Sequence, residues 1–392
     1  MQLRTLGVSA LLAGVVLTSA LWTPVSEARR PARAPEVSGS VGFSTLAPDL
    51  AADSPNSAVQ LGELWALMSH SPSPSWSPDG KRFALHDAYC VSVVRRDGSI
   101  EKTLRAPEQM YMEDTCRHPR WSPSGKELVV SGSFYGESWR MDRRDRWVKP
   151  VVARGQGIWG ASYSPDGRWI LGRTPQTGAV VLPVEGTGVA HAVATAQEPS
   201  MGAYFTSLSP DGRHAARVLG EHGEAGVLEL FQIDLSAAPI GVSPNPWPTL
   251  DTGGDYPARL GQRMLTLPGV VPEYAWSADG NSLVAVTETS WYPAYEEYNY
   301  PEGPLVLVDL RAGTSRNLGL TGINPTLSPD GQWVAFAREG VMGIWVAPTD
   351  GSGAARLLHG FGTEPLWSPD GSRMLVYDVP SAWAEVLTLR EG

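Results

Sequence analysis

Short apolar runs separated by polar turn sequences recur along most of this chain. A large apolar residue stands directly before the serine of each of seven similar polar turn sequences, at Trp76, Trp121, Tyr163, Leu208, Trp276, Leu327 and Trp367. A polar stretch follows each of these serines, and in most repeats a second apolar run comes next, as at residues 83–85, 128–130 and 334–336. Short apolar runs bounded by turn residues are typical of β-strands. The pattern therefore predicts seven strand–turn–strand units.

The polar stretch between the two strands reads Ser-Pro-Asp-Gly. It begins at Ser77, Ser164, Ser209, Ser328 and Ser368, and it recurs with one change at Ser122, where Ser124 replaces Asp, and at Ser277, where Ala278 replaces Pro. Pro sets φ for the first central position of a type I turn, Asp tolerates the second, and Gly takes the left-handed conformation that follows. The stretch predicts a tight hairpin with a bulge. We interpret its aspartates as turn formers rather than as ligands or catalysts.

The spacing of the repeats indicates the fold. The seven serines are separated by 45, 42, 45, 68, 51 and 40 residues. A β-rich repeat of about 40–45 residues is typical of the blades of a β-propeller. A second pair of strands is expected in each repeat, for example at 90–95 and 100–105. We therefore predict an all-β protein in which residues 57–392 form a single-domain β-propeller of seven four-stranded blades.

The repeat resembles the WD40-like (PD40) repeat of TolB-type β-propellers. That repeat reads roughly Pro-x-Trp-Ser-Pro-Asp-Gly-Lys-x-hydrophobic-Ala-hydrophobic, and residues 74–85 match it almost completely. Residues 119–130, 325–336 and 365–376 match well, whereas Gly172 and Arg217 stand where the family has an apolar second strand. The resemblance covers roughly residues 60–392. It implies the propeller fold and says little about activity.

The order of strands in a blade sorts the connections onto two faces. We letter the strands a to d from the axis outward. The a–b and c–d turns then lie on one face, named the turn face. The b–c and d–a connections lie on the other, named the loop face, because the chain reverses direction at each strand.

The last repeat lacks an outer strand. After Ser368 the chain offers one strand at 374–378 and another at 385–390, and then it stops. A closed ring leaves no open edge, so residues 57–70 are expected to supply the missing strand. The alternative is a short helix packed outside the ring, since Leu64, Leu67 and Met68 have near-helical spacing.

The N-terminal residues predict export. Residues 1–28 combine a positive start at Arg4, an apolar stretch over 6–22 and the small residues of Ser26-Glu27-Ala28, which is the pattern of a secretory signal peptide. An uncleaved membrane anchor is the alternative. Residues 29–56, rich in Pro, Ala and Ser, are interpreted as a flexible linker. The mature protein is expected in the periplasm or outside the cell, as a monomer without a membrane span.

The two cysteines, Cys90 and Cys116, are expected on the same face of the propeller. Cys90 stands at the b–c junction of blade one, and Cys116 stands in the d–a connection to blade two. In an oxidising compartment such a pair is usually bridged, so a disulfide is the favoured interpretation. Two free thiols and a metal site with His86 and His118 are the alternatives, although the spacing fits no zinc signature.

One connection concentrates aromatic and acidic residues. Residues 288–302 form the b–c connection of blade five, and they hold Trp291, Tyr292, Tyr295, Glu296, Glu297, Tyr298 and Tyr300. Aromatic side chains anchor protein interfaces, and loops held by a rigid scaffold carry function. These seven residues are therefore the candidate binding residues. The alternative is that the rings fold back and pack over the mouth of the central channel.

The sequence shows no catalytic motif. It has no Gly-x-Ser-x-Gly, no His-Glu-x-x-His and no phosphate-binding glycine loop. An insertion at 236–261 holds Asp251 and Asp255, too few ligands for calcium, and is interpreted as a surface loop. The net charge of −10 without a basic stripe argues against a nucleic-acid partner.

Two functions remain in competition. The favoured one is an exported, non-catalytic scaffold that binds a protein or cell-envelope ligand on its loop face and needs no cofactor. The alternative is a propeller enzyme, a lyase or lactonase, with a metal in the channel. A metal assay on the purified protein would separate the two.

Overall fold

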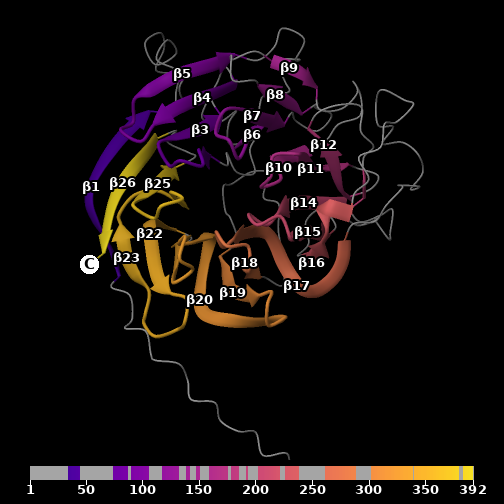
Figure 1. Ribbon diagram of the computed structural model, residues 1–392. Helices are drawn as coiled ribbons and strands as arrows, with labels where there is room; N and C mark the ends of the chain where they lie inside the picture. The colour runs from indigo at the N-terminus through magenta and orange to yellow at the C-terminus, as the bar shows by residue number, and fades with distance from the viewer. Residues whose placement is uncertain are drawn as a thin grey trace, which may run out of the picture. The chain divides into compact units, whose positions relative to one another are not determined.

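The computed structural model describes fifteen stretches of the chain: residues 34–44, 74–86, 90–105, 117–131, 138–141, 147–150, 159–174, 178–184, 191–192, 202–220, 226–237, 261–287, 302–338, 340–378 and 383–391. Their strands form four antiparallel sheets of four strands and one of ten (Figure 1). A single turn of 3-10 helix at Leu235–Ala237 is the helical element of these residues. None of the described helical structure is long and apolar enough to cross a membrane.

The first three sheets follow one another along the chain. The first holds β2 (Ser75–Trp76), β3 (Arg82–His86), β4 (Cys90–Arg95) and β5 (Ile100–Arg105). The second holds β6 (Arg117–Trp121), β7 (Leu128–Ser131), β8 (Trp139–Met141) and β9 (Trp147–Pro150). The third holds β10 (Trp159–Tyr163), β11 (Trp169–Thr174), β12 (Gly178–Pro183) and β13 (His191–Ala192). In each, neighbouring strands of the sheet are consecutive in the chain.

The ten-stranded sheet continues this order. It holds β14 (Gly202–Leu208), β15 (His214–Gly220), β16 (Gly226–Ile233), β17 (Gly261–Trp276), β18 (Ser282–Thr287), β19 (Gly303–Asp309), β20 (Thr314–Leu327), β21 (Trp333–Arg338), β22 (Val341–Pro348) and β23 (Arg356–His359). Two long strands join its parts. The first part of β17 pairs with β16 and the last part with β18, and β20 divides in the same way between β19 and β21.

The last sheet brings together the two ends of the described chain. It holds β24 (Glu364–Trp367), β25 (Arg373–Asp378), β26 (Trp383–Glu391) and β1 (Pro35–Ser44), with β1 paired antiparallel to β26. The prediction of a linker over all of 29–56 is therefore wrong for Pro35–Ser44. The strand was missed because most of its side chains are exposed, so backbone pairing holds it without a strong apolar pattern. Residues 57–70, which were expected to close the ring, lie outside the described residues.

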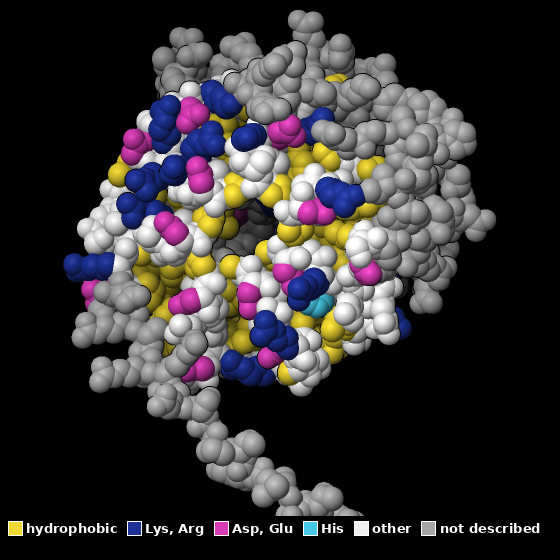
Figure 2. Space-filling view, in the orientation of Figure 1, with side chains coloured by type: hydrophobic (Ala, Val, Ile, Leu, Met, Phe, Trp, Pro, Cys, Tyr) yellow, Lys and Arg dark blue, Asp and Glu magenta, His cyan; other side chains and the backbone are white. Residues whose placement is uncertain are grey.

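Apolar side chains fill the spaces between several pairs of neighbouring sheets. Separate buried clusters join the first sheet to the second and the third to the ten-stranded sheet, and a further cluster joins that sheet to the last. Trp76 and Phe83 of the first sheet pack with Leu375 and Val386 of the last sheet, which closes the series. Burying one such aliphatic side chain contributes roughly 1.5–3 kcal/mol. Figure 2 shows a hollow at the centre, bordered largely by hydrophobic side chains.

Indole N–H groups add polar links between sheets. Trp76 Nε1 donates to the carbonyl of Leu366 at 3.2 Å, and Trp121 Nε1 donates to the carbonyl of Ser75 at 2.9 Å. Trp276 Nε1 donates to Ser207 Oγ at 2.8 Å. Each tryptophan directly precedes the serine of its turn, so the repeated apolar position also supplies a donor to the preceding repeat.

The Ser-Pro-Asp-Gly turns have the predicted hairpin geometry. In the first, Gly80 N donates to the carbonyl of Ser77 at 2.9 Å, and Ser77 Oγ donates to Asp79 Oδ1 at 2.6 Å. Gly80 has φ of +65°, which glycine adopts without strain. The hydrogen bond from Ser77 is the main cause that lowers the pKa of Asp79 below its ordinary value of 3.8. The aspartate accepts hydrogen bonds within its own turn, as the turn-former interpretation requires.

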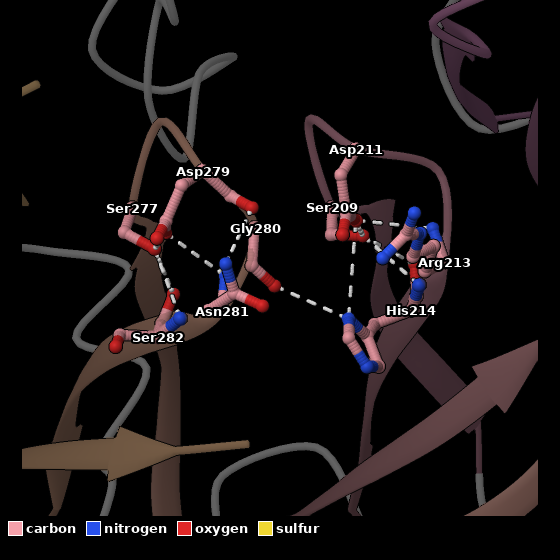
Figure 3. Close-up of polar contacts among 9 residues, drawn as sticks. All are labelled: Ser209, Asp211, Arg213, His214, Ser277, Asp279, Gly280, Asn281 and Ser282. Carbon is pink, nitrogen blue, oxygen red and sulfur yellow. Dashed lines mark hydrogen bonds and ion pairs between the residues drawn. The ribbon is translucent and has the colours of Figure 1, made fainter. Parts of the chain in front are cut away.

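Neighbouring turns touch one another. In Figure 3, His214 Nδ1 lies 3.2 Å from the carbonyl oxygen of Gly280 in the next turn. A Cβ added to Gly280 would stand 2.5 Å from Asp211 Oδ1. A Cβ added to Gly80 would meet Pro369 of the last turn at 3.7 Å. These turns therefore contact their neighbours, and the first lies against the last.

Candidate binding surface

The segment predicted to bind a ligand is attached to two paired strands. β18 ends at Thr287, β19 begins at Gly303, and the two strands pair from Ser282 with Asp309 to Val286 with Leu305. β18 starts beside the fifth turn, so its far end lies about 20 Å away at ~3.3 Å per residue. The predicted position of this connection, between the second and third strands of its repeat, is confirmed for the flanking strands.

The base of this connection is tightly held. Thr287 Oγ1 donates to the carbonyl of Pro304 at 3.0 Å, and Thr321 Oγ1 donates to Glu302 Oε1 at 2.7 Å. A Cβ added to Gly303 would stand 2.4 Å from the carbonyl oxygen of Thr287. Only glycine permits so close an approach of the two strands. The segment between them is therefore presented from a fixed base.

The seven candidate binding residues, Trp291, Tyr292, Tyr295, Glu296, Glu297, Tyr298 and Tyr300, lie outside the described residues. Their proposed role rests on the sequence and on the geometry of the strands on either side. Glu302, at the described end of the segment, carries its carboxylate on the same face.

Exposed apolar side chains stand at the same end of the next repeat. Val341 and Met342, the first residues of β22, follow Gly340 with 49% and 57% of their surface exposed. Leu357, on the paired strand β23, is 49% exposed. Neither Val341 nor Met342 was among the candidate residues predicted from the sequence. Two large apolar residues directly after a tight turn were the available signal.

An arginine braces this end of the repeat. The guanidinium of Arg338 lies 4.2 Å from the ring centroid of Trp345 and 5.8 Å from that of Phe336. Such cation–π contacts contribute about 0.5–1 kcal/mol at exposed sites. They hold the strand ends beside Val341 in place.

Of the two cysteines, the described strands include the backbone of Cys90. Cys90 is the first residue of β4 and pairs with Arg105, the last residue of β5, while β6 begins at Arg117, directly after Cys116. Cys90 therefore falls at a strand end on the loop face, as does Arg117, the first residue of β6. Cys116 and the side chain of Cys90 lie outside the described residues, so the disulfide stays a prediction.

The described residues hold no group of three or more His, Cys, Asp or Glu side chains placed to bind a metal ion. Two buried carboxylates, Glu364 and Asp378, lie at the loop-face ends of β24 and β25. On the face drawn in Figure 2, both acidic and basic side chains surround the hollow, with several basic ones gathered over β3–β5.

Comparison with known proteins shows the fold. No model of a known protein family matches the chain, and no curated protein matches it either. Among solved structures, the β-propeller domain of Cps50 (Swd1) from Myceliophteria thermophila is similar, with a TM-score of 0.54 and 14% identity over 82% of this chain and 97% of that one. At that identity the likeness shows fold alone. The chain is a mostly β protein with the β-propeller fold of WD40-like domains.

Proposed function

We propose that this protein is a seven-bladed, non-catalytic propeller that binds a protein or cell-envelope ligand on its loop face. The blade count follows if β17 and β20 each serve two neighbouring blades, so that the ten-stranded sheet supplies three blades beside the four separate sheets. Its repeats are assigned to the TolB-type family on the residues that carry the resemblance. A monomer is sufficient for this function.

The observation that carries the proposal is the fixed base of the 288–302 segment. The contacts around Thr287 and Gly303 hold its two ends together. A rigid scaffold that presents a long aromatic connection is the usual design of a binding loop. Val341 and Met342 add exposed apolar surface on the same face.

The chemistry of the segment defines the ligand class. Trp291 and the four tyrosines offer rigid apolar area with polar tips, which suits a protein or carbohydrate surface. Glu296 and Glu297 favour a basic partner and speed its approach. The proposal includes residues 1–28 as a signal sequence for export to the periplasm or outside the cell, an oxidising compartment in which Cys90 and Cys116 would form a disulfide.

The test replaces one ring and measures binding and stability together. Immobilised wild-type protein, Trp291→Ala and the turn-face control Arg96→Ala are exposed to the same cell-envelope extract. Loss of capture by Trp291→Ala alone, with all three melting temperatures alike, is expected. A Trp291→Ala variant that captures normally but loses roughly 3–5 kcal/mol of stability, as for a fully buried ring, would show that the ring packs against the propeller instead.

A further inference from the structure

The closing strand β1 is held chiefly by its backbone. It pairs with β26 from Pro35 opposite Glu391 to Ser44 opposite Trp383, with one irregularity between Val37 and Gly39. Backbone hydrogen bonds of this kind form with any extended strand of compatible shape. The pairing itself therefore does not require that β1 and β26 belong to one molecule.

Side-chain packing adds little to this attachment. Glu36 and residues 38–42 are exposed, and Val41 shows 44% of its surface. Pro35 is buried, and Val37 is part-buried where it packs on the core between the last two sheets. By contrast, Ala384, Val386 and Leu387 of β26 are almost fully buried. Opening β1 would thus leave the core in place and expose an unpaired strand edge, which recruits another strand.

The remaining contacts select this chain's own sequence. The guanidinium of Arg356 donates to the carbonyl of Pro35, and Ser38 Oγ donates to the carbonyl of Thr388 at 3.2 Å. Arg390 and Glu36 form an ion pair at 3.5 Å. A second copy of β1 would reproduce every one of these contacts, whereas an unrelated strand would lose those made by side chains.

The chain is long enough for exchange. Residues 45–74 separate β1 from β2, and a stretch of that length spans roughly 100 Å when fully extended at ~3.3–3.6 Å per residue. We infer that the outer edge of β26 is an interaction surface for a second copy of this chain, and that two molecules exchange β1 to form a dimer. Because exchange conserves the strand pairs, protein concentration sets the balance between monomer and dimer.

The test uses two variants, each with one added cysteine, whose added cysteines meet only across an exchanged pair. Glu36→Cys supplies β1 and Arg390→Cys, carrying a mass tag, supplies β26. The two proteins are mixed at high concentration, warmed so that β1 can open, cooled and treated with a short thiol cross-linker. Wild-type protein treated in the same way gives the background from Cys90 and Cys116.

A covalent heterodimer well above that background is expected. The matched control mixes Glu36→Cys with Ile100→Cys, which is exposed on the unrelated strand β5 and reports random collision. The double variant Glu36→Cys/Arg390→Cys, diluted before reaction, must give an internal cross-link at monomer mass, which shows that β1 is in place. A heterodimer yield no higher than that of the control, beside a complete internal cross-link, would overturn the inference. Neither result depends on a ligand for the loop face.

Discussion

Replacing Gly280 with alanine tests whether the turns support one another around the ring. Gly280 has φ of +69°, and an added Cβ would lie 2.5 Å from Asp211 Oδ1 and 3.1 Å from Asp211 N. Gly331 holds the same position in the next turn, with φ of +70° and no atom within 4 Å of an added Cβ. The two alanine variants therefore share the backbone strain and differ in the contact between turns.

The expected losses follow from these geometries. A non-glycine residue in the left-handed region costs roughly 1–2 kcal/mol, which is the whole effect expected for Gly331→Ala. In Gly280→Ala, the carboxylate of Asp211 must also move. It accepts hydrogen bonds from Ser209 Oγ at 2.6 Å and from Arg213 N at 3.0 Å. Losing two such bonds at about 1 kcal/mol each brings the expected total to roughly 3–4 kcal/mol.

Urea unfolding followed by tryptophan fluorescence measures the difference. The midpoint of Gly280→Ala should fall clearly below that of Gly331→Ala, with similar slopes for both. Equal losses would refute the reasoning, because they would mean that adjacent turns make no supporting contact. If the dependence of the unfolding free energy on urea concentration changed in one variant only, the two unfolding transitions would differ in kind and their midpoints could not be compared.

Three further predictions concern closure, the thiols and acid stability. Deleting residues 34–44 should cost about 2–4 kcal/mol through lost net hydrogen bonds and packing, measured by urea unfolding beside a deletion of 57–70, which should cost less. Cys90 and Cys116 should resist a thiol-blocking reagent in native, unreduced protein and react after reduction. The folded-state pKa of Asp79 is lowered, so its stabilising contribution is present above its ordinary pKa of 3.8 and is lost as pH falls through the folded value. Asp79→Asn should therefore flatten the acid side of the stability profile.

The repeated parts of the fold could be predicted from sequence because one physical solution recurs. In the first repeat, an apolar residue to be buried is indicated by Trp76, a tight turn by Ser77 and a left-handed backbone conformation by Gly80. The same signals return in six more repeats. β1 carries none of them. Its attachment comes from pairing with β26, far away in the chain, and a local pattern cannot reveal that pairing.

Some features of the candidate surface could likewise be predicted from the sequence, and others could not. The position of the 288–302 segment between two strands could be predicted, because strand order alone decides the face. The close approach of Gly303 to Thr287 could not, since it depends on how β18 and β19 converge. The exposure of Val341 and Met342 was also not predicted, because the sequence pattern alone predicts that an apolar residue beside a turn is buried in a strand.

The most direct test of the proposed function is amide hydrogen exchange on the protein with and without the ligand that it captures. Binding on the loop face should slow exchange in residues 288–302 and at the adjoining strand ends, Thr287 and Gly303. Exchange in the Ser-Pro-Asp-Gly turns should stay unchanged. Protection confined to those turns, with none in 288–302, would contradict the account.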